Sequence, residues 1–354
     1  MRLLTGYLMR TILTGTALVM VVLLALAALF EFIGQLDNTE GDFGTAQALM
    51  YSLLRLPQLS FQMFPIATLI GSLLGLGGLA SNSELVVMRT AGVSMSRLAS
   101  MVAVSGLAIA AATALIGEFI GPPLDYYART MRTELRFGEE NANFGNDAWV
   151  KDGPVILHLQ RVNSQFDFGN IYLFRFNEAG DIESIGRAEN SGIDESDNWI
   201  LENLSETRFA GDRVEVAEST RSVETFDVDS SLLGFTLVKP ISLSARGLLS
   251  YIDYLRRNEL SAIRYETELW SRISMTTTVV LMPVLALAFV FGSLRSAGAG
   301  SRLMIGVLVG LAYFLASEML ANSGEVYNLN PAILTWIPSL VLVSVAWFAL
   351  HRIR

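Results

Sequence analysis

The sequence predicts an α-helical membrane protein with six spanning helices (3+3) and an inserted all-β domain, which is a sandwich, a jellyroll-like fold or a barrel. Of 354 residues, 52% are hydrophobic and only 17% are charged, whereas soluble domains carry about 25% charged residues. Six apolar stretches match the roughly 20 residues that cross a bilayer as a helix. Between the third and fourth stretch, short alternating runs separated by turn residues are typical of a strand-rich domain.

The expected spans lie within unusually apolar sequence. The first contains an uncharged run of 20 residues, 11–30, which is longer than the core of a signal peptide, so we expect a retained span. Pro65 and Pro283 fall inside the second and fourth spans and are expected to kink them. The six spans are predicted at about 11–33, 56–80, 98–120, 273–294, 303–321 and 331–350.

Charge in the short connections predicts the orientation. One set of ends carries eight arginines and a single acid, Glu84, whereas the other short loops are mostly acidic. Basic short loops remain cytoplasmic, so we expect both termini inside and the central domain on the side facing away from the cytoplasm. The acidic net charge of −9 then comes mainly from the outer part and gives no sign of a nucleic-acid partner. The basic set is Arg2, Arg10, Arg89, Arg97, Arg295, Arg302, Arg352 and Arg354.

Small and acidic residues in the spans leave alternatives open. Gly71–Gly75 and Gly306–Gly310 have the small-xxx-small spacing that lets helices approach closely, either within the chain or between subunits. Glu118 and Glu318 lie near the outer ends of spans three and five. An acid in a span is a functional candidate, but near the interface it can simply be solvated.

The predicted organisation has three parts: spans one to three in 1–120, the β domain in 121–265, and spans four to six in 266–354. Within the middle part, Val155–Leu159 and Ile171–Phe176 have the character of strands. Ser242 and Ser244 are suited to cap a helix from Ala245 to about Asn258. This helix would connect the sheet domain to the fourth span.

The segment 82–92, between spans two and three, is predicted to be a short cytoplasmic helix. It starts with cap-type residues and ends at Gly92, a residue suited to the left-handed conformation. Such a helix is marginal alone. It either docks on a cytoplasmic partner or lies along the membrane as a connector. In the docking reading, Leu85 and Met88 are apolar anchors and Glu84 or Arg89 is paired.

Several motifs resemble one family over essentially the whole chain. The run Ser83–Gly92 resembles the coupling-helix signature of the LptF/LptG permease family of lipopolysaccharide-export ABC transporters. The local forms are more similar to the LptG branch than to LptF. The other matching segments are Phe64–Gly75, Trp149–Gly153, Glu268–Arg272 and Phe291–Ser296.

This resemblance implies a permease subunit without a catalytic site, cofactor or metal of its own. Its implied partners are an LptF permease, a dimer of the LptB ATPase that binds ATP-Mg, the LptC subunit and the substrate, lipopolysaccharide. The sequence agrees, since it has no cysteine, two histidines and no Gly-x-x-x-x-Gly-Lys-Ser/Thr loop. The energy must then arrive mechanically, through the segment around Glu84.

The resemblance also implies substrate contacts. Arg129 and Arg132 match head-group positions, and Arg136 continues the run; the alternative is that they snorkel or pair with Glu134 and Glu139. Spans one and five are expected to line a cavity, although plain packing explains their apolar residues equally well. The candidate acyl-chain contacts are Phe30, Ile33, Phe61, Phe64, Phe314 and Leu320.

One position departs from the family. Glu31 stands near the end of span one, where well-known members carry a lysine. An acid repels phosphate unless it binds a divalent cation or pairs with an arginine, so Glu31 is not predicted to contact substrate. Two rival readings remain: an intramembrane lipid-modifying enzyme built on Glu118 and Glu318, and a mechanotransmission or scaffold subunit that never admits substrate.

Overall fold

The protein forms two compact units in the computed structural model, and each is described by itself. The first comprises Met1–Asn38, Ala48–Ala128 and Ile263–Arg354, and the second comprises Thr39–Gln47 and Arg129–Ala262. The division falls inside two helices, between Gln47 and Ala48 and between Ala128 and Arg129. The structure describes residues 2–37, 41–141, 148–160, 168–194, 198–211, 213–226, 228, 232, 239–292, 298–327 and 329–352.

The first unit is a bundle of long apolar helices. In the described part of the chain, six helices are long and apolar enough to cross a membrane, which confirms the predicted spans. Most extend well beyond the predicted apolar stretch, because polar turns continue the same helix. The helices are α1 (Arg2–Leu36), α2 (Thr45–Ser81), α3 (Glu84–Thr90), α4 (Met95–Leu115), α5 (Gly121–Asn141), α8 (Ile263–Phe291), α9 (Ala299–Tyr327) and α10 (Pro331–Arg352).

Helix α2 is the centre of the bundle, with 67% of its apolar window buried against 22% for α1 and 17% for α9. A Cβ atom on Gly71 would lie 2.5 Å from the Cα of Thr16 on α1. A Cβ atom on Gly306 would lie 2.9 Å from Leu73 on α2. Both small-residue faces therefore pack within this chain, which decides between the two alternatives left open by the sequence.

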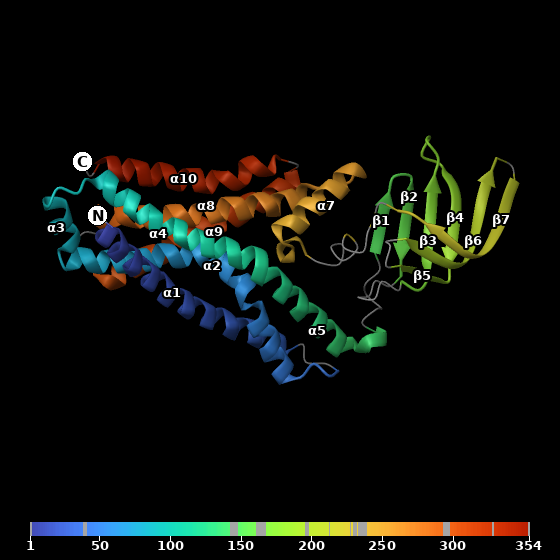
Figure 1. The fold of residues 1–354 in the computed structure, drawn as a ribbon, viewed down its shortest axis with the longest axis horizontal. Helices are drawn as coiled ribbons and strands as arrows, with labels where there is room; N and C mark the ends of the chain where they lie inside the picture. The colour runs from blue at the N-terminus through green and yellow to red at the C-terminus, as the bar shows by residue number, and fades with distance from the viewer. Residues whose placement is uncertain are drawn as a thin grey trace. The chain divides into compact units, whose positions relative to one another are not determined.

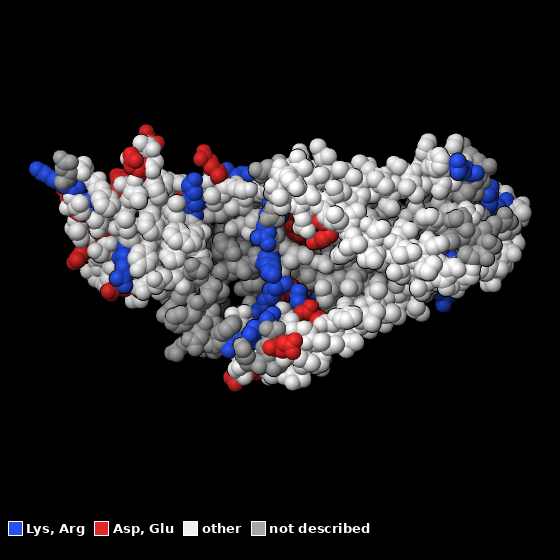
Figure 2. Space-filling view, turned by 180° about the vertical axis from the view of Figure 1, so that it is seen from behind, with Lys and Arg blue, Asp and Glu red and all other residues white. Residues whose placement is uncertain are grey.

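Both chain ends and α3 lie at the same end of the bundle (Figure 1), here called the α3 end. Figure 2 shows the helices as a long surface with few charged side chains until basic ones reappear at its right-hand end. This distribution is the one expected for a surface that faces hydrocarbon between two polar boundaries.

The third span does not stop at residue 120 as predicted. A π-helical turn, η1 (Ile116–Ile120), joins α4 directly to α5. Gly121, Pro122 and Pro123 suggest a break, but the helix continues through them directly after the π-helical turn. The helix therefore continues for some twenty residues into what the sequence assigned to the β domain.

The second unit contains a seven-stranded antiparallel sheet, which confirms the predicted jellyroll-like β domain. Its order is β1-β2-β3-β4-β6-β5, and β7 also pairs with β6. One face is apolar and buried, with Leu157, Leu173 and Trp199 at 0–1% exposure. The strands are β1 (Ala148–Asp152), β2 (Val155–Leu159), β3 (Ile171–Phe176), β4 (Ile182–Ala188), β5 (Asn190–Ile193), β6 (Trp199–Ala210) and β7 (Arg213–Glu224).

The predicted connecting helix, α7 (Ala245–Arg257), begins where the capping serine placed it, since Ser244 Oγ accepts from the N–H of Gly247 at 3.1 Å. Tyr254 on this helix binds the outer strand β1. Its hydroxyl accepts from the N–H of Lys151 and donates to the carbonyl of the same residue. Asn258 accepts from the N–H of Gly153 at 2.8 Å. These contacts satisfy edge groups of β1 that a further strand would otherwise pair.

Candidate functional site

Helix α3 is a seven-residue element set off by two left-handed residues, Ser83 (φ 61°) and Gly92 (φ +91°). Glu84 lies in its first turn, where a negative charge suits the helix dipole. The carboxylate of Glu84 accepts a hydrogen bond from the hydroxyl of Tyr7 on α1 at 2.7 Å. Leu85 is fully buried in the bundle core.

These contacts change the predicted docking surface of α3. Leu85 anchors α3 to its own bundle, so it is not an exposed anchor for a partner, and Met88 also packs against the core. The guanidinium of Arg89 lies 5.8 Å from the ring centre of Phe291 at the end of α8. The outward apolar residues are Val86 and Val87, at 39% and 62% exposure. Helical spacing could have found them, because 86 and 87 lie opposite the face shared by 85 and 88.

Arg302 is a functional candidate that the sequence analysis treated only as a loop charge. It is 3% exposed at the start of α9. Its Nη1 donates to the hydroxyl of Ser81 at 3.0 Å. Its side chain fills the space left by Gly77, where a Cβ atom would lie 2.6 Å from Cδ. Arg302 thus joins α9 to the turn that leads into α3, and no sequence signal distinguishes a buried arginine from a loop arginine here.

At the opposite end of the bundle, a cluster of charged residues links three helices. Arg55 on α2 donates from Nε to Oδ1 of Asp125 on α5 at 2.9 Å and from Nη1 to Oε1 of Glu31 on α1. Gln35 donates to the same oxygen of Glu31 at 3.0 Å. Of the two possibilities raised for Glu31, the structure shows the arginine pair. The described residues contain no group of three or more His, Asp or Glu that could hold a metal ion.

The three predicted head-group arginines lie on α5. Because α5 is helical through Asn141, the spacing of Arg129, Arg132 and Arg136 places them along one face. All three are half-buried and engaged in interactions. Their role in binding a head group stays a prediction.

The predicted lining residues divide into two groups. Phe30 and Ile33 on α1 are exposed at 70% and 50%, and Phe314 and Leu320 on α9 are half-buried. Phe61 and Phe64 are buried at 5% and 9% exposure, so they pack inside the bundle and present no surface to a ligand. The ring of Phe61 fills the space beside Gly117 and lies 5.7 Å below the guanidinium of Arg272.

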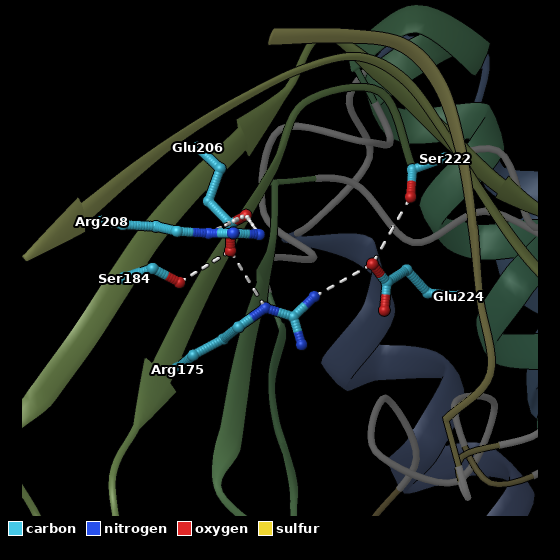
Figure 3. A network of polar contacts seen from close by, with 6 residues as sticks. All are labelled: Arg175, Ser184, Glu206, Arg208, Ser222 and Glu224. Carbon is cyan, nitrogen blue, oxygen red and sulfur yellow. Dashed lines mark hydrogen bonds and ion pairs between the residues drawn. The ribbon is translucent and has the colours of Figure 1, made fainter. Parts of the chain in front are cut away.

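The sheet carries a second charged network, drawn in Figure 3. Glu206 accepts from Ser184 Oγ and pairs with Arg175 and Arg208, and Arg175 also pairs with Glu224 at 3.0 Å. Burial by itself would raise the pKa of Glu206, but the hydrogen bonds from Ser184 and Arg208 prevail and lower it below 4.5. These groups satisfy one another, so the network has the character of a structural clamp.

Six membrane-length helices, a short helix tied between two of them, and an inserted antiparallel sheet define a multi-pass membrane protein of the transporter-subunit type. The chain belongs to the family described as lipopolysaccharide export system permease LptF/LptG, which matches residues 6–352. It is similar to the lipopolysaccharide export system permease protein LptG of Haemophilus influenzae, with 30% identity over 98% of both chains. It is also similar to LptG of Escherichia coli K12, with 29% identity over 98% of this chain and 97% of the relative.

Proposed function

We propose that this chain is the LptG-type permease subunit of an ATP-driven exporter that removes lipopolysaccharide from the inner membrane. It pairs with an LptF permease and an LptC subunit and docks through α3 on a dimer of the LptB ATPase. Both termini are cytoplasmic and the sheet domain is periplasmic. Family membership over residues 6–352 supports this proposal, and the anchoring of α3 to the bundle is the observation that carries it.

The anchoring of α3 supports a mechanical role. A short helix that only lay on the membrane surface could move without moving the spans. Here Leu85 is buried, Glu84 is bonded to α1 through Tyr7, and Arg89 lies over Phe291 of α8. A force applied to α3 therefore acts on α1 and α8 together. The ATP-Mg that supplies this force is bound by the partner, since this sequence has no phosphate-binding loop.

The opposite end of the bundle suits an anionic amphiphile. The exposed side chains of Phe30 and Ile33 on α1 can contact acyl chains. In the second unit, the arginine face of α5 supplies the planar, permanently charged donors that bind phosphate well, through Arg129 and Arg132. The sheet, with its apolar inner face, then receives the lipid.

Co-purification tests the docking arrangement. The tagged chain, expressed with its neighbours in their native membrane, should retain a nucleotide-binding subunit and a second six-span permease. Glu84→Gln should reduce recovery of the ATPase, because a charge-assisted contact is worth about 1.5–3 kcal/mol, or roughly ten- to a hundredfold in affinity. Val87→Asp should also reduce it, because it would place a charge in an apolar contact with the partner. Tyr7→Phe is the matched control, since it removes the bond inside the chain and leaves the carboxylate of Glu84.

The results separate docking from internal stability. Loss of the ATPase with Glu84→Gln but not with Tyr7→Phe supports docking through the carboxylate. Equal loss in both variants would mean that Glu84 acts only inside the bundle. Normal ATPase recovery with both Glu84→Gln and Val87→Asp would refute the role of α3 as the docking element.

A further inference from the structure

The two carboxylates that share Arg55 are not equivalent. The side chain of Asp125 is fully buried, whereas those of Glu31 and Arg55 are 17% and 18% exposed. The Arg55–Asp125 pair is thus closed on one side by the bundle, and the Arg55–Glu31 pair reaches the surface. The three formal charges sum to −1.

The difference in burial decides which contact can be exchanged. Withdrawing Arg55 from Asp125 would leave an uncompensated buried charge, which is strongly unfavourable. Withdrawing Glu31 from Arg55 costs less, because both side chains already reach the surface in part, at 17% and 18% exposure, and can be solvated there. Arg55 therefore stays with Asp125, and Glu31 is the exchangeable partner.

Exchange at Glu31 would release part of α1. Glu31 and Gln35 lie one turn apart and bond to each other, so they move together. The same part of α1 exposes Leu26, Leu29 and Phe30, whereas Gln35 is buried at 7% exposure, so the ion pair is one of the contacts that hold this part of α1 against α2. The helix tied by Glu31 is the one that carries the exposed apolar face assigned above to acyl chains.

We infer that Arg55 is a head-group contact of the exported lipid, held closed by Glu31 until a phosphate of that lipid takes the carboxylate's place. Resting on the proposed function, this assigns to the Glu31–Arg55 pair the role of a latch between α1 and α2. The phosphate accepts from the same Nη1 that Glu31 now occupies, while Nε remains on Asp125. Glu31 thus does not bind the anion itself but competes with it for Arg55.

The test measures lipid binding to the purified complex in nanodiscs. The probes are bis-phosphorylated lipid A, the same lipid with its phosphates removed, phosphatidylglycerol and inorganic phosphate. Glu31→Gln keeps the Arg55–Asp125 pair and should raise the affinity for bis-phosphorylated lipid A by about three- to tenfold, as expected for removing one charged competitor. Adding Arg55→Gln should abolish this gain. Glu318→Gln is the matched control, since that exposed acid on α9 receives a hydrogen bond only from Asn322 among the contacts described.

A second measurement follows the latch directly. The sequence has no cysteine, so spin labels at L29C and L53C, two exposed positions on α1 and α2, report the separation of these helices. Without lipid, Glu31→Gln should lengthen or broaden the distribution of distances between the two labels. In the protein that keeps Glu31, adding lipid A should have the same effect.

Each outcome bears on the inference. No gain with Glu31→Gln, or the same gain with Glu318→Gln or with the dephosphorylated lipid, overturns it while the proposed function stands. An equal gain for phosphatidylglycerol, or full competition by inorganic phosphate, assigns the contact to another source of phosphate and also overturns it. If the unaltered complex fails to bind lipid A at all, the proposed function falls together with it.

Discussion

The crossing of α1 and α2 at Gly71 is predicted to be the most sensitive packing contact in the bundle. A Cβ atom at Gly71 would lie 2.5 Å from Thr16 Cα and 2.6 Å from the carbonyl carbon of Gly15. Gly15 faces the same restriction, with its Cβ atom 2.5 Å from the carbonyl oxygen of Gly71. These opposing atoms are backbone, so no side-chain rotation can make room.

The magnitude follows from this geometry. Ordinary contact begins at 3.4 Å, so the Gly71→Ala variant must separate the two helices by about 1 Å at the crossing. Overpacking of this kind costs about 1–3 kcal/mol, against a gain of about 1 kcal/mol for alanine over glycine in a helix. We expect a net loss of stability of up to about 2 kcal/mol.

Gly78→Ala is the matched control, because it lies on the same helix and its Cβ atom would meet nothing within 4 Å. Thermal unfolding of both variants in the same detergent, followed by the monodisperse fraction on size exclusion, measures the difference. We expect Gly71→Ala to melt several degrees below Gly78→Ala. Equal melting temperatures would refute the reasoning that backbone contact fixes this crossing.

Three further predictions concern the second unit and α5. Glu206 has a lowered pKa, so its stabilising contribution is present above pH 4.5 and is lost as the pH falls through the folded-state pKa. The Glu206→Gln variant should therefore be less stable by about 1 kcal/mol at pH 7. Unfolding followed by circular dichroism should also show that its stability depends less on acid pH. Tyr254→Phe should cost about 1–2 kcal/mol and speed amide exchange at Lys151, because both hydrogen bonds of the hydroxyl are lost. Arg129→Glu with Arg132→Glu should weaken lipid binding while ATPase recovery is retained; unchanged binding would leave these arginines as interfacial anchors.

Hydrophobic length and charge were sufficient to predict the six helices and the strand-rich insert. The bilayer imposes one requirement, satisfied backbone over about 30 Å, and a run of apolar residues can meet it only as a helix. Likewise, alternation in Val155–Leu159 and Ile171–Phe176 matched β2 and β3 as observed. Signals of this kind are local in sequence, so they survive without knowledge of the tertiary contacts.

The candidate site was less predictable because its residues are defined by distant contacts. Leu85 looks like a surface anchor until α3 is seen folded back on the core. Phe61 and Arg272 lie far apart in the sequence. In the fold, the guanidinium of Arg272 lies over the ring of Phe61, which fills the space beside Gly117. The pairing of Glu31 with Arg55 depends on where two helices cross, which neither residue reveals alone.

The π-helical turn at Ile116–Ile120 has a consequence for the helix that follows it. Such a turn holds one residue more than an uninterrupted α-helix. That residue offsets the side chains of α5 by about 100° from the directions they would take without it. The turn therefore sets which way Asp125 faces, and the ion pair of Asp125 with Arg55 depends on a single additional residue several positions earlier in the chain.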